Sequence, residues 1–393
     1  MLFAEYAEIC AMHVAYVYII LMSFISAYPV CSWLDIKQEP CYCNYTLKKA
    51  GVIMAELTIR DIAKQAGVSV ATVSRVINGN GNVKPELKKR VSDVIAKTEF
   101  MPNISARTLK SKKTQTIGVV ISDISDRYYS LMTKTLADTL SEKDYSLIIC
   151  CTDNNAAKEK MFFDFLCAKS VDGIILNTVG TLDKEICALS KRVPLVMVNR
   201  KIALCPNARL DYIGSDDFNG GYEMTKYLLQ KSHRRIGILN GNLNVSSGMD
   251  RYCGFCAAMK DAGITVDESY PYRVDGNFDF TSGYTGIAEL MKHNPKPTAV
   301  ITTNDSTTVG AMQYCQEHKI RIPEDLSLVA YGDVDNAILF AVHPTYITLN
   351  PHTIGLRAAQ CLFDRIGDPL CPNREIVFTS NLKEGDSVRA PNE

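Results

Sequence analysis

A short run of small and polar side chains has the chemistry needed to read the edges of DNA bases. It covers Ser69–Arg75 and reads SVATVSR. An arginine such as Arg75 can pair bidentately with guanine, and the side chains of Val70 and Ala71 can pack on thymine methyl groups. The hydroxyl groups in the run can donate or accept further hydrogen bonds. If the run opens a helix that lies in the major groove, its N-terminal residues can face the edges of bases.

A first helix that precedes the run is predicted over residues 59–66. Thr58 is a good N-cap, and Asp61 three residues later completes an approximate capping box. Apolar residues recur at helical spacing along this segment. Gly67 follows and is free to take the left-handed conformation that ends a helix. A tight turn is therefore expected directly before the run.

The run itself is predicted to open a second helix. Ser69 can cap a helix over 70–77, and Asn78 with the next glycine stops it. A third helix, with a basic outer face, is expected over 85–97. Two short helices joined by a glycine-containing turn are typical of a helix-turn-helix, whose second helix lies in the major groove.

The charges of the chain are split between its parts. The 393 residues carry 43 Lys+Arg and 43 Asp+Glu, so the formal net charge is zero. Residues 54–113 carry 12 basic and 5 acidic residues, a net of +7, whereas residues 114–393 carry 28 and 34, a net of −6. The first 53 residues supply the remaining −1. A small basic module joined to a large acidic one favours a polyanion binder with a separate sensing or assembly domain.

Two stretches resemble the lac-repressor (LacI/GalR) family of bacterial transcription regulators. They are TIRDIAKQAGVSVATVSRVING from residue 58 and FMPNISARTLKSKKTQTIGVVISDIS from residue 100. The resemblance implies a DNA-binding headpiece over 54–99 and a hinge over 100–113. It implies that the DNA contacts come from Thr58, Ser69, Val70, Ala71, Thr72, Ser74, Arg75, Asn78, Asn103, Ala106, Arg107 and Leu109.

In the resembled family the hinge forms a short helix only on DNA. A helix as short as 104–109 is marginal in water by itself, and the segment taken alone also fits a solvated linker. The resemblance places Leu109 as a wedge in a minor-groove base step, with Ala106 beside it. Arg107 and the lysines that follow would add salt-dependent phosphate contacts.

Residues 114–393 alternate short apolar runs with helical patterns. The apolar runs cover 117–122, 146–152, 173–179, 194–199, 235–241, 299–305 and 326–333. This alternation predicts an α/β fold with parallel sheets. Phosphate-binding glycine motifs and a nucleophile elbow are missing, which argues against an enzyme. The resemblance extends to about residue 388 and implies two α/β subdomains, joined by three crossovers, with a ligand in the cleft between them.

The resemblance also implies the residues of that cleft. They are Tyr128, Tyr129, Asn199, Arg200, Ser247, Arg251, Phe278, Asp279, Asn304 and Asp333, with Asp305 acting in part as a helix cap. Alternatives remain open from the residues alone. The two tyrosines also suit a hydrophobic core, and Arg251 also suits a surface salt bridge.

The expected effector is a small sugar-like molecule, and two departures from the family favour an acidic one. Asn199 and Gly332 stand where sugar-binding members commonly place carboxylates, while Arg200 and Arg251 remain. Fewer anions beside two arginines predict a sugar acid or a sugar phosphate, which an arginine can hold bidentately. The alternative is a neutral sugar, with Asp333 in the vacant role and Arg200 turned outward.

Residues 1–53 do not fit the rest of the chain. No charged residue occurs between 9 and 34, and this stretch is long enough to span a bilayer. Three interpretations are open: a membrane anchor, a poor signal peptide, or translated sequence upstream of a true start at Met54. We favour the third. The other two interpretations would suit a membrane-tethered regulator or a periplasmic solute-binding protein.

The cysteines do not form a recognisable metal site. Ten of the 14 lie beyond residue 53, and most are embedded in apolar runs, which favours reduced thiols. Cys253 and Cys256 form a C-x-x-C pair inside a helical pattern without a second pair at zinc-site spacing. No metal and no cofactor is therefore expected.

These patterns and the resemblance together imply a cytoplasmic, nucleoid-associated repressor that binds a pseudo-palindromic operator as a homodimer. The predicted fold is α/β, with an all-α headpiece and a periplasmic-binding-protein-like domain of two α/β subdomains. The domains are expected at 1–53 (doubtful extension), 54–99, 100–113 and 114–393. No leucine heptad follows the last strand pattern, so a dimer rather than a tetramer is expected. No stable membrane association is expected.

Overall fold

The computed structural model describes residues 57–77, 83–98, 100, 113–203, 206–333 and 342–391. The chain divides into two compact units, Met1–Pro102 and Asn103–Glu393, which are described separately. Several predictions fall outside the described residues: those on the first 53 residues and those on Asn78, Asn103, Ala106, Arg107 and Leu109. The exact limits of the predicted hinge therefore stay predictions.

The first unit contains the three predicted helices, α2 (Ile59–Ala66), α3 (Val70–Ile77) and α4 (Pro85–Thr98). The third helix extends one residue beyond its predicted end. Their apolar faces meet in one small core, in which Ile62, Val73 and Val91 are completely buried. Each helix is too short to be stable alone, so this shared core holds the three together.

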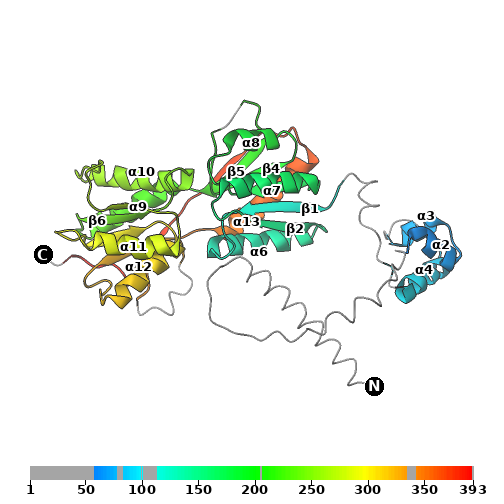
Figure 1. Cartoon of the computed structure of the whole chain (residues 1–393), viewed down its shortest axis with the longest axis horizontal. Helices are drawn as coiled ribbons and strands as arrows, with labels where there is room; N and C mark the ends of the chain where they lie inside the picture. The colour runs from blue at the N-terminus through cyan, green and yellow to red at the C-terminus, as the bar shows by residue number, and fades with distance from the viewer. Residues whose placement is uncertain are drawn as a thin grey trace, which may run out of the picture. The chain divides into compact units, whose positions relative to one another are not determined.

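The second unit consists of two lobes, seen side by side in Figure 1. The part built on the sheet β2-β1-β3-β4-β5-β11 is called the first lobe, and all strands of this sheet are parallel. Its strands are β1 (Thr116–Ile121), β2 (Ser146–Cys151), β3 (Gly173–Leu176), β4 (Leu195–Val198), β5 (Leu210–Ser215) and β11 (Glu375–Phe378). Its helices are α6 (Arg127–Ser141), α7 (Ala156–Ala168), α8 (Asp183–Leu189) and α13 (Pro351–Gly367).

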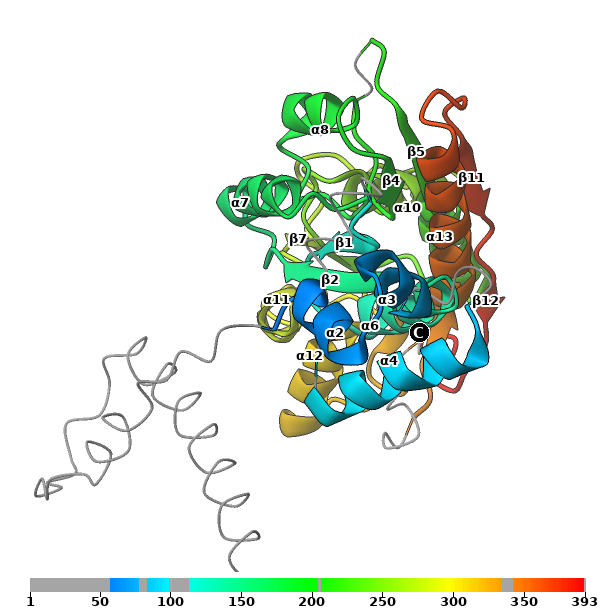
Figure 2. The same cartoon turned by 90° about the vertical axis from the view of Figure 1, so that its right-hand side faces the viewer.

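Helices cover both faces of the first-lobe sheet. Figure 2 shows α7 and α8 on one side of β1, β4 and β5, and α13 on the other. Helices α6 and α13 pack with one set of strand side chains, and α7 and α8 pack with the alternate set. The inner strands β3 and β4 are buried at every position, as expected for parallel strands covered on both faces.

The second lobe is built in a similar way on the sheet β7-β6-β8-β9-β10-β12, except that β12 runs antiparallel to β10. Its strands are β6 (Ile236–Asn240), β7 (Arg273–Asp275), β8 (Ala299–Thr302), β9 (Ser327–Tyr331), β10 (Thr345–Ile347) and β12 (Leu382–Lys383). Its helices are α9 (Asp217–Gln230), α10 (Ser246–Asp261), α11 (Phe280–Leu290) and α12 (Asp305–Glu317). Helices α9 and α10 cover one face and α11 and α12 the other.

Three segments cross between the lobes. They join β5 to α9, β10 to α13, and β11 to β12. The α/β fold with two subdomains and three crossovers is thus confirmed, and all seven predicted strands are present. The seven apolar runs do not cover β5, β7, β10, β11 and β12, and β7, β10 and β12 have only two or three residues.

Three further findings bear on the sequence-based expectations. No helix in the described part of the chain is long and apolar enough to cross a membrane. Cys187 in α8 is disulfide-bonded, whereas the other described cysteines are free. The expectation that all cysteines beyond residue 53 are reduced thiols is therefore wrong for Cys187. No cluster of three or more metal-ligating side chains occurs within the described ranges.

Candidate nucleic-acid interface and ligand cavity

The turn between α2 and α3 has the predicted geometry. The Thr58 backbone N–H donates to the Asp61 carboxylate at 2.9 Å, and the Asp61 N–H donates back to the Thr58 hydroxyl at 3.4 Å. Gly67 ends α2 in the left-handed conformation, with φ of 61°. The Ser69 hydroxyl accepts from the Thr72 N–H at 3.2 Å and caps α3. The predicted capping box and second cap are confirmed.

The first turn of α3 presents its side chains to solvent. Ser69, Val70, Ala71 and Arg75 are exposed, and Val70 is 42% exposed although it is apolar. Thr72 and Ser74 are half-buried. An exposed valine and alanine beside an arginine, on a helix held rigidly by its core, form a surface that suits the edges of bases. The predicted side chains at the start of α3 are thus accessible, and their contact with DNA stays a prediction.

Arg90 of α4 fixes the same turn, and the sequence analysis assigned it only to an exposed basic face. One of its terminal nitrogens donates to the Ala66 carbonyl at 2.6 Å, at the end of α2. Carbonyls at a helix C-terminus lack partners within the helix, and a cation there is favoured by the helix dipole. The third helix therefore orients the first two through a charged contact as well as through the core.

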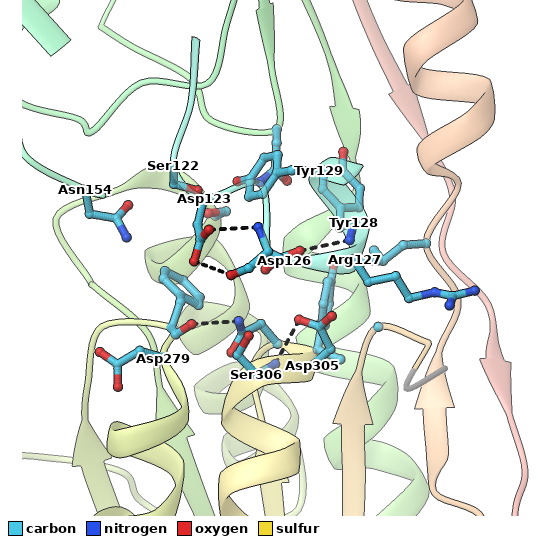
Figure 3. Close-up of a pocket in the computed structure, with 18 of the residues that line it drawn as sticks. Ser122, Asp123, Asp126, Arg127, Tyr128, Tyr129, Asn154, Asp279, Asp305 and Ser306 are labelled. Carbon is cyan, nitrogen blue, oxygen red and sulfur yellow. Dashed lines mark hydrogen bonds between the residues drawn. The ribbon is translucent and has the colours of Figure 1, made fainter. Parts of the chain in front are cut away.

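A cavity of about 880 Å³ opens in the second unit, lined by both lobes. It lies where the parallel strands end, because its lining residues follow β1, β2, β4, β6, β7, β8 and β9 in the chain. Figure 3 shows part of this lining. All ten predicted cleft residues, and Asp305, line this one cavity. The structure thus brings together residues that span more than 200 positions of the chain.

Arg200 points inward at the start of the segment that follows β4. It is 3% exposed, and one terminal nitrogen donates to the Asn154 side chain and the Thr178 carbonyl, both at 2.9 Å. Its Nε is buried without a partner. The alternative that Arg200 is turned outward is therefore wrong. A buried N–H without an acceptor is costly, so this group is suited to an acceptor atom of a ligand.

Arg251, in α10, forms a buried ion pair. Its Nε and one terminal nitrogen each lie 2.8 Å from the same Asp217 oxygen, and the other terminal nitrogen donates to the Thr303 carbonyl at 2.6 Å. The guanidinium also lies 3.8 Å from the centre of the Tyr331 ring. The alternative of a surface salt bridge needs correction, because the ion pair is buried. Arg251 lines the cavity, and its contact with a ligand stays a prediction.

Phe278 provides an aromatic surface between the two arginines. Its ring centre lies 5.8 Å from the guanidinium carbon of Arg200 and 5.7 Å from that of Arg251. Its φ is 62°, a conformation that bulky residues rarely adopt. Gly241 makes room for the ring, since a Cβ atom there would lie 2.1 Å from it. The Asn304 side chain donates to the Phe278 carbonyl at 2.8 Å and holds this conformation.

The tyrosines belong to both the core and the cavity. Tyr129 is 5% exposed and packs in the first-lobe core, while Tyr128 packs against it edge to face. The Asn199 amide donates to the Tyr129 hydroxyl at 3.0 Å. Asn199 has a φ of 62°, which asparagine tolerates better than most residues. The Tyr128 hydroxyl is buried without a partner and lines the cavity, where it is available to a ligand.

Capping at the second lobe differs from the expectation. Asn304, rather than Asp305, is the N-cap of α12, because its side chain accepts from the Thr307 N–H at 3.1 Å. Asp305 is the first residue of the helix, and its carboxylate accepts from the Ser306 N–H at 2.8 Å. Asp279 caps α11 by accepting from the Ser282 N–H at 2.7 Å.

The lining is more acidic than the sequence analysis assumed. It contains six aspartates and three arginines, namely Asp123, Asp126, Asp153, Asp279, Asp305, Asp333, Arg127, Arg200 and Arg251. Three of these aspartates were missed: Asp123, Asp126 and Asp153. Burial and the charge of Asp305 raise the pKa of Asp126 to about 7, and burial raises the pKa of Asp305 as well. Carboxylates accept hydrogen bonds from hydroxyl groups, so this lining suits a polyhydroxylated ligand.

Comparisons with known proteins match both units. Residues 58–103 match the model of "bacterial regulatory proteins, lacI family", and residues 114–392 match that of "periplasmic binding proteins and sugar binding domain of LacI family". The chain is 32% identical to the HTH-type transcriptional repressor PurR of Haemophilus influenzae, over 79% of this chain and 91% of that protein. It is 31% identical to the ribose operon repressor of Escherichia coli K12, over 84% of this chain and 99% of that protein.

Solved structures show the same fold. The lac repressor dimer bound to operator and the anti-inducer ONPF aligns with a TM-score of 0.74 at 22% identity, over 85% of this chain and 99% of that one. The complex of the transcriptional regulator CelR with cellobiose aligns with a TM-score of 0.63 at 25% identity, over 84% of this chain and 100% of that one.

Proposed function

The chain belongs to the lacI family of bacterial regulatory proteins, and from this we propose that it represses transcription under the control of a sugar-like effector bound in the cavity between the two lobes. Its relatives are transcriptional repressors, so the chain is a DNA-binding regulator and not an enzyme. The observation that carries the proposal is the pairing of a helix-turn-helix, whose helix α3 has an exposed first turn, with a cavity lined by two lobes.

The assembly and the remaining site residues are part of the same proposal. Two copies bind a pseudo-palindromic operator, because each headpiece reads one half-site. The domain limits at 54–99, 100–113 and 114–393 and the predicted hinge contacts belong to it, as does a cytoplasmic, nucleoid-associated location. The family membership supports these points, and the cavity residues described above are the proposed effector contacts.

Arg75→Ala should weaken binding to the operator by about 1–3 kcal/mol, because a bidentate arginine contact to guanine is worth about that much. Binding to unrelated DNA should change little. Gel-shift titration of the whole chain on operator and on scrambled DNA measures both. Lys97→Ala removes another exposed cation, at the end of α4, and should leave the ratio of the two affinities unchanged. Normal operator binding by Arg75→Ala would contradict the assignment of α3 as recognition helix.

For the effector, we propose a sugar acid or a sugar phosphate. The aspartates of the lining would accept hydrogen bonds from the hydroxyl groups of this effector. The unpaired Nε of Arg200 would donate a hydrogen bond to its anionic group. Arg251 contributes less than the sequence suggested, since Asp217 neutralises it. The sugar bound by the relative CelR, cellobiose, supports the carbohydrate part of this proposal only.

A thermal-shift screen of neutral sugars, sugar acids and sugar phosphates on the whole chain should give hits among the acids or phosphates. Arg200→Ala should lower the affinity for the best of these ligands by at least about tenfold. The reason is that it removes one member of a buried charged contact worth about 2–5 kcal/mol. Arg192→Ala, which removes an exposed arginine of the same lobe, is the matched control. Hits confined to neutral sugars, with the same affinity in Arg200→Ala, would exclude the acidic effector.

A further inference from the structure

Two carboxyl groups from opposite lobes meet at the cavity. Asp126 comes from the first lobe, where it caps α6, and Asp305 comes from the second lobe, where it begins α12. Figure 3 shows the two side chains entering the same part of the cavity from opposite sides. Both side chains line this one cavity, and the charge of Asp305 raises the pKa of Asp126. Two carboxylates that face each other from opposite lobes repel unless one of them carries a proton.

Each carboxyl is fixed by its own helix, and one also reaches the other lobe. The Asp126 carboxylate accepts from the Tyr128 N–H at 2.9 Å, and the Asp305 carboxylate accepts from the Ser306 N–H at 2.8 Å. Asp305 also accepts from the backbone N–H of Arg127, in the first turn of α6. Asp305 therefore joins the second lobe directly to the first, next to Asp126.

The charged groups around the pair favour a bound proton. Asp123, in the loop after β1, adds negative charge and raises the pKa of Asp126 further. From the second lobe, Asp279 at the start of α11 and Asp333 after β9 line the same cavity. From α13, His352 lines it as well, and its Nδ1 lies 2.7 Å from the Thr135 hydroxyl.

The arginines of the cavity are engaged elsewhere. Arg251 is paired with Asp217, and Arg200 binds Asn154 and Thr178 in the first lobe. The Arg127 side chain extends away from the two carboxyl groups in Figure 3. A proton, rather than an arginine, is thus what can hold the pair together.

We propose that Asp126 and Asp305 form a proton-dependent latch, in which one proton shared by the two carboxyl groups holds the lobes closed and its loss drives them apart. The latch acts on the lobes whether or not a ligand is present. Its consequence for repression rests on the function proposed above, in which the position of the lobes sets the affinity for DNA.

The direction of the pH effect follows from proton linkage. In an open form each carboxyl faces water and has an ordinary pKa near 4, whereas with the lobes placed as in this structure, which we take as the closed form, the pKa of Asp126 is about 7. Closure therefore takes up one proton between these two values. The ratio of closed to open molecules should fall by up to about tenfold for each pH unit as the pH rises from 4 to 7, and should stay constant above that range.

The latch can be tested on the whole chain without DNA and without ligand. Lys184 of α8 and Lys260 of α10, which are both exposed, are replaced by genetically encoded noncanonical amino acids that carry spin labels. The distance between the two labels reports the distance between the lobes. The wild type should show a short distance at pH 5.5 and a longer one at pH 8. Asp126→Asn, whose amide can donate to Asp305 at any pH, should keep the short distance at both. Asp164→Asn, which removes an exposed carboxylate of α7, should behave as the wild type.

Titration of aspartate Cγ signals by NMR gives a second, independent readout. One aspartate should titrate near pH 7 in the wild type, and that signal should be missing in Asp126→Asn. In Asp305→Asn it should shift to a lower pKa, because the charge of Asp305 no longer opposes ionisation of Asp126. A wild-type distance that does not change with pH, or aspartates that all titrate below pH 5, would overturn the latch. Because neither measurement involves DNA, failure of operator binding would bear on the proposed function alone.

Discussion

Asp217→Ala is expected to lower the free energy of unfolding of the second unit by about 3–5 kcal/mol, because it leaves a buried charge without a counter-charge. One Asp217 oxygen accepts from two nitrogens of Arg251 at 2.8 Å and from the Tyr331 hydroxyl at 2.7 Å. The three residues are at most 5% exposed. Urea denaturation followed by circular dichroism measures the loss.

The neighbouring aspartate is the matched control for this prediction. Asp216 caps α9 by accepting from the Asn219 N–H at 3.0 Å, and it faces partly to solvent. Asp216→Ala should therefore lower the unfolding free energy by about 1 kcal/mol, the usual loss for an N-cap. Equal losses in the two variants would show that the ion pair with Arg251 contributes no more than a cap does.

Asp211→Ala should destabilise the first lobe by a similar amount, about 3–5 kcal/mol. Asp211 lies on β5 and is completely buried. It accepts from Arg365 of α13 at 2.7 Å and from the side chain of Arg374, just before β11, at 2.9 Å. Arg365 is 1% exposed and would lose its only ion-pair partner among the described residues. Urea denaturation measures this variant in the same way.

Asp364→Ala is the control, because it removes a second carboxylate from the same arginine. Asp364 lies 2.7 Å from Arg374, but its side chain is 63% exposed. Solvent screens exposed pairs, so its loss should change the unfolding free energy by less than about 1 kcal/mol. If Asp211→Ala were as mild as Asp364→Ala, the buried network would not hold α13 and β11 to β5 as described.

The helix-turn-helix could be predicted from the sequence because its signals are local. Caps such as Thr58 and Ser69, and the left-handed Gly67, act within four residues of their own position. The strands with continuous apolar runs could be recognised for the same reason. Strands β7 and β10 have three residues each, which is too short for a periodic pattern, and they form because neighbouring strands pair with them.

The residues of the cavity lining were predicted from a resemblance to a family. The features of the lining that this prediction missed depend on tertiary contacts. The charge of Arg251 appeared free because Asp217 is 34 positions away in the chain, on another helix. Asp126 could have been recognised as a helix cap, since an aspartate follows a strand and precedes a helical pattern. The placement of Asp126 and Asp305 in one cavity could not have been predicted, because the two residues come from different lobes.

The order in which the lobes are completed has a consequence for synthesis on the ribosome. The first lobe begins with β1, yet α13 and β11 reach it only after residue 350, when most of the second lobe has been made. In the finished protein, Ile354, Ala358 and Leu362 of α13 cover one face of the first-lobe sheet. Until α13 has been made, this face lacks that cover. At about 5–20 residues per second, the ribosome takes roughly 7–30 s to pass from β5 to α13. During that interval the nascent first lobe presents apolar surface to chaperones and to neighbouring nascent chains of the same message.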